Sequence, residues 1–215
     1  MTEHDLSPHA AERGQTPFSA ALAHISDADV AAAVGRAAAR AFDEGAVEVA
    51  YCEVDSPLGT LVAAGTGRGL LRLAYEDFNG GLDAVLEHLA HRVSPRIVEL
   101  PAKLDAVRRE LDEYFEGRRR GFDVPIDWSL TTGFTQRVLQ ATARIPFGAV
   151  SSYAGVAADA GSPRATRAAG NALGSNPLPI VVPCHRVLRS GGKLGGYTGG
   201  LDKKEHLLRL EGVLI

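Results

Sequence analysis

The stretch NPLPIVVPCHRVL, residues 176–188, decides the fold class of this chain and points to its chemistry. Within it, Cys184 follows a proline and precedes His185 and Arg186. A thiol reacts as its thiolate, and neighbouring cationic or imidazole groups lower its pKa and populate that form. We expect the apolar run at 180–182 to form a strand that delivers an ionised sulfur to the floor of a pocket. Taken alone, an adjacent cysteine and histidine are more often a buried structural cysteine beside a surface histidine.

The residues before this stretch predict three short helices. The apolar spacing over 134–145 marks the first helix, which ends at Pro146 and Gly148. Residues 152–160 form the second helix. Residues 163–173 form the third, with a proline that a first turn accepts. Two short helices joined by a turn that contains glycine indicate a helix-turn-helix.

The residues after the stretch are rich in glycine. RSGGKLGGYTGGL (189–201) holds six glycines within residues 190–200, a density that fits a hairpin or wing passing close to another group. The last helix is expected to open at Asp202, with Glu205 three residues later in a capping-box arrangement, and to run to Glu211.

The first half of the chain follows a different pattern. Residues 1–45 read as an N-terminal extension made of a tail and Ala-rich helices, with no chemistry of its own. The alternating segments VEVAYCEV, TLVAA and LLRLAY then predict an antiparallel meander between residues 47 and 75. Cys52 lies in its first strand, where a packed thiol is expected. Helices over 80–93 and 102–116 follow, with a strand over 96–100 between them.

Charge separates the two halves. The 215 residues carry a formal charge of −3, yet residues 129–215 hold 10 basic and 4 acidic side chains. We place a domain boundary at 128/129, where the sign of the charge changes. A basic segment in an acidic chain favours a polyanionic partner for that segment, although many charged faces bind nothing.

The C-terminal segments together resemble the O6-alkylguanine-DNA alkyltransferases (methylated-DNA–protein-cysteine S-methyltransferases). The resemblance rests on the stretch 176–188, on IPFGAVSSYAGVAADAGSPRATRAAGNALGSNP before it and on GGYTGGLDKKEHLLRLEG after it. It is strong over about 130–215 and extends weakly over 46–129 through SPLGTL and EYFEG. The fold it implies is α/β (α+β), with an RNase H-like domain at 46–128 and a winged-helix-like domain at 129–215. Residues 1–45 have no counterpart in it.

The resemblance also implies four catalytic roles. Cys184 is the acceptor that attacks the alkyl carbon on O6 of a damaged guanine, and His185 takes the thiol proton through a bridging water. Glu211 orients the imidazole, an assignment that rests on the resemblance alone, because a carboxylate near a helix end is most often solvated. Asn176 braces the active-site turn through backbone hydrogen bonds.

A second set of residues is implied to form the pocket for the base. Tyr153 and Thr198 match donors of hydrogen bonds to the guanine, and Tyr197 lines the same pocket, although tyrosines in a small domain are usually core residues. Val187 and Lys204 complete the set. Phe147 and Thr198 depart from the commoner residues of the family, and the threonine is expected to tighten the pocket against bulky alkyl groups.

A third set is implied to bind DNA. O6 is out of reach inside a duplex, so the nucleotide must leave the stack, and Arg167 matches the residue that fills its place. Small side chains on the same helix, Ala165, Ala168 and Gly170, suit a minor groove, although ordinary close packing also explains them. Four further cations are expected to contact phosphates: Arg164, Arg186, Arg189 and Lys193.

The expected activity is therefore a suicide repair reaction. The protein transfers the alkyl group of O6-alkylguanine, and of O4-alkylthymine, from DNA to its own Cys184 after flipping the base from the minor groove with its helix-turn-helix. The thioether product is stable, so each molecule acts once. Two rivals remain: a lesion sensor, against which the cysteine argues, and a cysteine hydrolase, which would turn over. A regulator switched by methylation would need metal-binding cysteines that residues 1–45 lack.

Composition limits the remaining classes. No apolar run approaches the ~18 residues of a membrane span, and the first ten residues carry no secretory signal pattern. With two cysteines, the chain predicts no disulfide framework and a reducing cytoplasm. Histidines upstream show no ligand spacing, so neither a structural metal nor a cofactor is expected. The expected partner is double-stranded DNA that contains O6-alkylguanine, bound by a monomer that does not contact membranes.

Overall fold

The computed structural model describes residues 26–213. The predicted tail at 1–16 and the start of the Ala-rich segment lie outside the described residues. Helix α2 spans Asp27–Asp43, within the range predicted to be helical. The chain divides into two units after Ala37, and the second unit, residues 38–215, contains every element discussed below.

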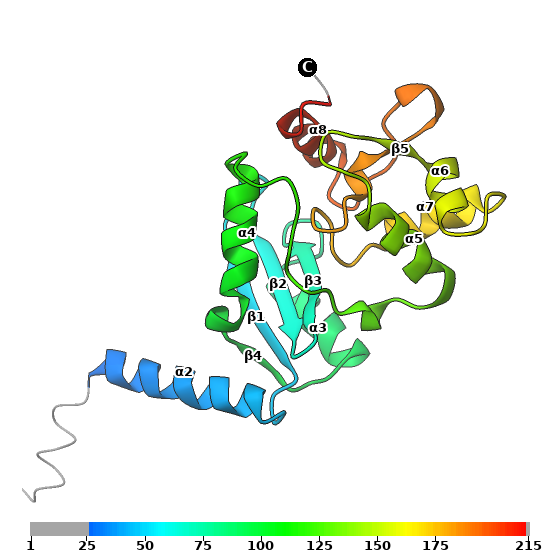
Figure 1. The fold of residues 1–215 in the computed structure, drawn as a ribbon. Coiled ribbons are helices and arrows are strands. Elements are labelled where there is room, and N and C mark those ends of the chain that lie inside the picture. The colour runs from blue at the N-terminus through cyan, green and yellow to red at the C-terminus, as the bar shows by residue number, and fades with distance from the viewer. Residues whose placement is uncertain (1–25, 214–215) are drawn as a thin grey trace, which may run out of the picture. The chain divides into compact units, whose positions relative to one another are not determined.

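A four-stranded sheet forms the first part of this unit (Figure 1). Strands β1 (Val49–Val54), β2 (Leu61–Thr66) and β3 (Gly69–Tyr75) pair antiparallel, which confirms the predicted meander. Strand β4 (Ile97–Glu99) pairs with β1 in parallel, so the sheet is mixed, with the order β3-β2-β1-β4.

Alternation along these strands buries both faces of the sheet. One face packs apolar side chains such as Leu61 and Leu73 against Leu111 of α4 (Asp105–Phe115), which follows the short turn η1 (Pro101–Leu104). The other face packs residues such as Val62 against Leu89 of α3 (Leu82–Arg92). Cys52 is buried among the residues of the first face, as its position in the strand predicts. An α/β fold results.

The chain leaves the sheet along the edge of β3. Leu70 donates its backbone N–H to Pro125 at 2.8 Å and accepts from Asp127 at 2.9 Å. Gly69 is required here, because its φ is +136° and an added Cβ would lie 2.2 Å from the Pro125 oxygen. This contact fixes where the second, helical part of the unit begins.

The helical part contains the three predicted helices. They are α5 (Gly133–Ala143), α6 (Tyr153–Asp159) and α7 (Thr166–Gly174), and they pack against one another. Pro163 lies before α7 and not in its first turn, so the predicted start of this helix is wrong by three residues. The short turn η2 (Trp128–Leu130) precedes α5.

The glycine-rich segment and the last helix differ from the sequence expectation. Strand β6 (Val187–Leu188) pairs in parallel with β5 (Ser151–Ser152), and the turn η4 (Ser190–Gly192) leads into an irregular loop. Within the described residues this segment forms no hairpin of its own. Helix α8 (Leu201–Leu210) is capped by Gly200 without a side-chain hydrogen bond, so the predicted capping box is also wrong.

No helix within residues 26–213 combines the length and the apolar character needed to cross a bilayer.

Candidate active site

The expected strand before Cys184 is absent, and a tight turn takes its place. Three prolines in residues 177–183 lack the N–H groups that a strand ladder requires. Ile180 adopts a φ of +74°, the only positive φ at a non-glycine residue in the described chain. Cys184 opens the short turn η3 (Cys184–Arg186) and is 5% exposed.

Asn176, to which the resemblance assigns a bracing role, makes hydrogen bonds to three residues of this turn. Its amide nitrogen donates to the Val182 oxygen at 2.8 Å and to the Cys184 sulfur at 3.2 Å. Its amide oxygen accepts from the Leu178 N–H at 3.0 Å. The Pro177 oxygen accepts from the Leu73 N–H at 2.9 Å, so the sheet anchors the same turn.

Replacing Asn176 by alanine is therefore expected to destabilise the protein by about 1–3 kcal/mol, because it leaves the buried Leu178 N–H without a partner and removes one of the two hydrogen bonds to the Val182 oxygen. The rate of the methyl transfer that the resemblance implies should fall with it, because the sulfur loses its hydrogen bond to Asn176. Urea unfolding and single-turnover kinetics measure the two effects. A variant with unchanged stability and rate would contradict the bracing role.

Glu211, at the end of α8, is the centre of a buried hydrogen-bond network. Its carboxylate accepts from Tyr114 Oη at 2.7 Å and from Arg186 Nε at 2.9 Å, and lies 2.9 Å from His185 Nε2. The Gly148 N–H also donates to it at 3.3 Å. Glu211 is therefore not a solvated carboxylate, and it can hold the imidazole as the resemblance implies.

Two residues of this network differ from the sequence expectation. Arg186 is buried and bound to Glu211 and to the Ile145 oxygen, so its predicted contact with a DNA phosphate is wrong. A buried carboxylate attracts the nearest guanidinium, which residue spacing alone does not reveal. Tyr114 also belongs to this network, although the sequence analysis assigned it no role in the site. The signal that could have found its role is the segment EYFEG, which the resemblance includes.

The ionisation states follow from burial. Desolvation opposes ionisation of Glu211, but hydrogen bonds from His185, Arg186 and Tyr114 outweigh it and lower its pKa to about 2. Burial lowers the pKa of His185 despite the carboxylate, so the ring is neutral near pH 7. With Nε2 at Glu211, Nδ1 has no hydrogen-bond partner within the described residues and is the nitrogen that can accept a proton.

The state of the sulfur corrects the sequence expectation. Burial raises the pKa of Cys184 to about 11, against the opposing effects of the Asn176 hydrogen bond and the Lys204 charge. The resting group is therefore a thiol and not the expected thiolate. The neutral imidazole of His185, next in the chain, is a group that can take up a proton.

The lowered pKa of Glu211 predicts how stability depends on pH. The folded-state value of about 2 lies below the ordinary value of 4.5. The ionised carboxylate therefore stabilises the fold fully above pH 4.5, and this contribution is lost as the pH falls toward 2. Urea unfolding between pH 7 and pH 2 should show a steeper loss for the native chain than for Glu211→Gln. Parallel curves would contradict the assignment.

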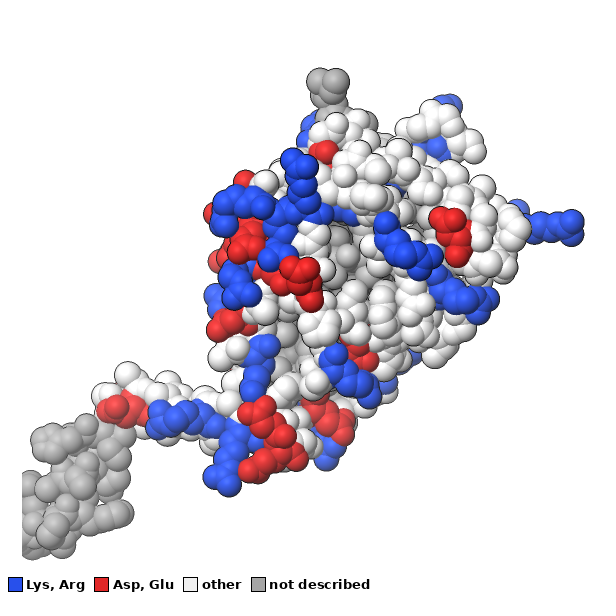
Figure 2. All heavy atoms as spheres, in the orientation of Figure 1, with Lys and Arg blue, Asp and Glu red and all other residues white. Residues whose placement is uncertain are grey.

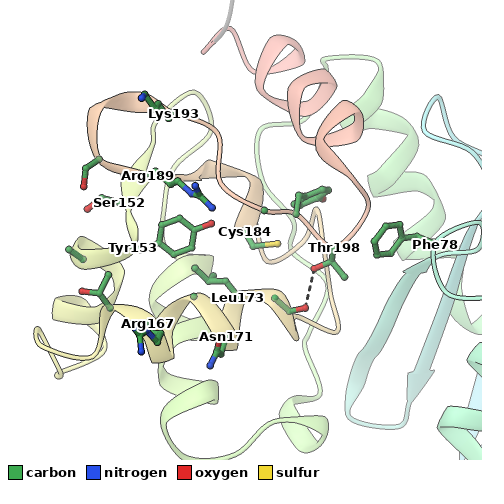
Figure 3. Close-up of a pocket in the computed structure, with 17 residues that line it drawn as sticks. Phe78, Ser152, Tyr153, Arg167, Asn171, Leu173, Cys184, Arg189, Lys193 and Thr198 are labelled. Carbon is green, nitrogen blue, oxygen red and sulfur yellow. Dashed lines mark hydrogen bonds between the residues drawn. The ribbon is translucent and has the colours of Figure 1, made fainter.

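A cavity of about 810 Å³ opens over Cys184 (Figure 3). Tyr153, Tyr197 and Thr198 of the predicted base pocket line it. Figure 3 shows the Tyr153 ring between Arg189 and Leu173, with its hydroxyl toward the side that holds Cys184. The glycine-rich loop passes so close that a Cβ on Gly195 would meet this hydroxyl at 2.2 Å.

Two predicted pocket residues lie elsewhere. Val187 is fully buried and its carbonyl accepts from Lys204 Nζ at 2.7 Å. Neither residue is among those that line this cavity, and their place in the base pocket stays a prediction. Burial lowers the pKa of Lys204 to about 8. The charge of this lysine lowers the pKa of the thiol, and its hydrogen bond holds the start of β6.

The sheet also contributes to the cavity, which sequence patterns did not indicate. Tyr75, at the end of β3, shares a hydrogen bond of 2.9 Å between its hydroxyl and that of Tyr197. Phe78 follows it in the next loop, is 55% exposed and lines the cavity on the far side of Thr198 (Figure 3). A Cβ on Gly199 would lie 2.6 Å from the Tyr75 ring, so the loop requires glycine there.

Helix α7 forms another wall of the cavity. Arg167 and Gly170 line it, and Arg167 is exposed. Ala165 caps α7 and Ala168 is exposed on it, both outside the cavity, while Ala169 faces the core. The exposed side of the helix therefore carries one long cation among small side chains.

The other predicted phosphate contacts lie on the surface. Arg189 and Lys193 are exposed at the cavity rim, and Arg164 is exposed just before α7. In Figure 2, acidic side chains are sparse on the part of the face where α5, α6 and α7 lie, and mixed with basic ones near α4. Within residues 26–213 no three His, Cys, Asp or Glu side chains gather as a metal site would require.

Comparisons with known proteins agree with this geometry. Residues 49–128 match the family profile described as 6-O-methylguanine DNA methyltransferase, ribonuclease-like domain. Residues 133–213 match the profile described as 6-O-methylguanine DNA methyltransferase, DNA binding domain. The two matches together cover well over half of the chain.

Individual relatives align over most of their own length. The methylated-DNA–protein-cysteine methyltransferase of Mycobacterium tuberculosis is 40% identical over 161 residues, 75% of this chain and 91% of that protein. The constitutive enzyme of that name from Bacillus subtilis is 38% identical over 164 residues, 75% of this chain and 94% of its own.

Solved structures give the same result. The crystal structure of the M. tuberculosis O6-methylguanine methyltransferase has a TM-score of 0.65 at 38% identity, covering 76% of this chain and 92% of that chain. A structure of the M. tuberculosis protein in complex with DNA has a TM-score of 0.64 at 38% identity, covering 75% and 92%. Because both halves match the family profiles and relatives align over most of their length, the chain belongs to the 6-O-methylguanine DNA methyltransferase family.

Proposed function

We propose that this chain repairs alkylated DNA by moving the alkyl group of O6-alkylguanine to Cys184, once per molecule. Membership of the family makes it a DNA-binding methylated-DNA–protein-cysteine methyltransferase. The observation that carries the finer proposal is the position of the Cys184 thiol in the wall of a cavity of about 810 Å³ that can admit a base, directly before a histidine held by Glu211.

The proposed reaction is an in-line displacement. The sulfur of Cys184 forms a bond to the alkyl carbon, the bond from that carbon to O6 breaks, and the electron pair goes to the guanine. The thiol proton passes through a water molecule to Nδ1 of His185, and Glu211 stabilises the imidazolium that forms. Hydrogen bonds from Tyr153 and Thr198 to the base offset its developing charge.

Access to the base requires that it leave the duplex. Unstacking costs a few kcal/mol, and less for an alkylated guanine, which pairs poorly. Arg167 occupies the vacated place in the stack, and α7 enters the minor groove on its small side chains. Arg164, Arg189 and Lys193 contact phosphates, so binding should weaken as salt increases. O4-alkylthymine is a second substrate of the same kind.

The decisive experiment is incubation with excess O6-methylguanine duplex, followed by intact-mass spectrometry. The proposal expects a gain of one CH2 per protein, located at residue 184 by peptide mapping. No gain would identify a lesion sensor, and release of many methyl groups per protein would identify a hydrolase. Either result would overturn the proposal.

A further inference from the structure

A second cavity of about 460 Å³ is lined in part by residues 174–177, the segment that leads toward Cys184. It shares Gly174 and Thr198 with the base cavity, and Asn176 lines it as well. The residues that line it include two arginines and one histidine and neither aspartate nor glutamate. The reaction proposed above uses none of these cations.

The cations come from the first part of the unit. Arg72 lies on β3, and His88 and Arg92 lie on α3 (Figure 1). Burial lowers the pKa of His88, and the charges of both arginines lower it further, because the three groups converge. One Arg72 nitrogen donates to Asn79 at 2.9 Å, while its Nε is buried without a hydrogen-bond partner within the described residues.

The opposite wall is built from neutral donors. Thr131, Thr132 and Thr135 line the cavity around the start of α5, an eleven-residue helix. Thr132 is the N-cap residue, but its side chain accepts no hydrogen bond from the first turn. The N–H groups of that turn and the positive end of the helix dipole therefore add to the guanidinium charges.

We propose that this cavity binds a phosphate group, and that the group belongs to the DNA strand whose nucleotide enters the base cavity. Planar guanidinium groups, hydroxyls and helix N–H groups are the donors that phosphate oxygens accept from, and an anion here would compensate the excess of positive charge. Successive phosphates follow a strand, so a cavity that shares a wall with the base cavity is placed to take one. The choice of DNA rests on the proposed function.

The test compares Arg72→Gln, Arg92→Gln and the control Arg108→Gln, which removes an exposed cation of α4 that lines neither cavity. Duplex binding is measured across salt concentrations. Each lost phosphate contact should lower the slope of log K against log salt by about one. We expect this change in Arg72→Gln and Arg92→Gln and not in the control. Arg92 is exposed, so its substitution keeps the test valid if Arg72→Gln folds poorly.

A second measurement uses inorganic phosphate alone. At constant ionic strength, phosphate should raise the Tm of the native chain and of Arg108→Gln, and raise it less in the two cavity variants. If phosphate raises the Tm less in the two cavity variants but all salt slopes stay equal, the cavity binds free phosphate. The proposal that it binds a phosphate of the DNA strand is then overturned. If neither measurement separates the variants, the site itself is overturned.

The salt slope of duplex binding and the shift in Tm are both independent of the mass gain that tests the proposed function. Reaction with free O6-benzylguanine involves no phosphate and should be equal in all three variants. Absence of any alkyl transfer would contradict the proposed function, whereas the phosphate-dependent rise in Tm would still be expected.

Discussion

Cys184→Ala is expected to gain no mass when it is incubated with O6-methylguanine duplex, while it still binds that duplex. Alanine removes the only thiol that lines the cavity and leaves the guanidinium groups of α7 and of the cavity rim unchanged. The loss should be complete, because the sulfur is itself the acceptor. Intact-mass spectrometry and an electrophoretic mobility shift measure the two properties.

Cys52→Ala is the matched control. Cys52 is buried in β1, 2% exposed, and burial raises its pKa to about 11 as well. The Cys52→Ala variant should gain one CH2 like the native chain. The Cys52 thiol lines no cavity and has no neighbouring histidine, so it is not expected to reach the lesion. Methyl uptake by Cys184→Ala, or its loss in Cys52→Ala, would show that the acceptor is misassigned.

Arg167→Ala is expected to slow the repair of duplex by about 100-fold and to leave reaction with free O6-benzylguanine nearly unchanged. The arginine offsets part of the few kcal/mol that unstacking costs, and each ~1.4 kcal/mol lost is a factor of about ten in rate. A free base has no stack to leave, so its reaction does not depend on this side chain. Single-turnover kinetics on the two substrates measure the ratio.

Arg164→Ala separates this role from simple attraction to phosphates. Arg164 is also exposed and lies three residues earlier, but it does not line the cavity. Its loss should weaken duplex binding in a salt-dependent manner and leave the rate at saturating protein intact. Equal losses by Arg167→Ala on duplex and on free base would refute the proposed role of Arg167.

Local sequence patterns were sufficient for most of the secondary structure. Alternation over 47–75 predicts β1, β2 and β3, because a strand with one buried face repeats every two residues. Glycine and proline after residue 145 end α5, because neither continues a helix well. The same local rules failed at 180–182, where an apolar run predicts a strand and the neighbouring prolines prevent one.

The family and its acceptor could also be identified from the chain, because the stretch at 176–188 and its flanks are contiguous. The protonation states of the site residues and their hydrogen-bond partners could not be identified from the chain. Arg186 and Glu211 are 25 residues apart, and Tyr114 lies 97 residues before Glu211, yet the fold buries them in one network. Burial then makes Cys184 a thiol, whereas residue types alone favoured a thiolate. Charge state depends on desolvation and on distant partners, and both exist only after the sheet and the helices have packed together.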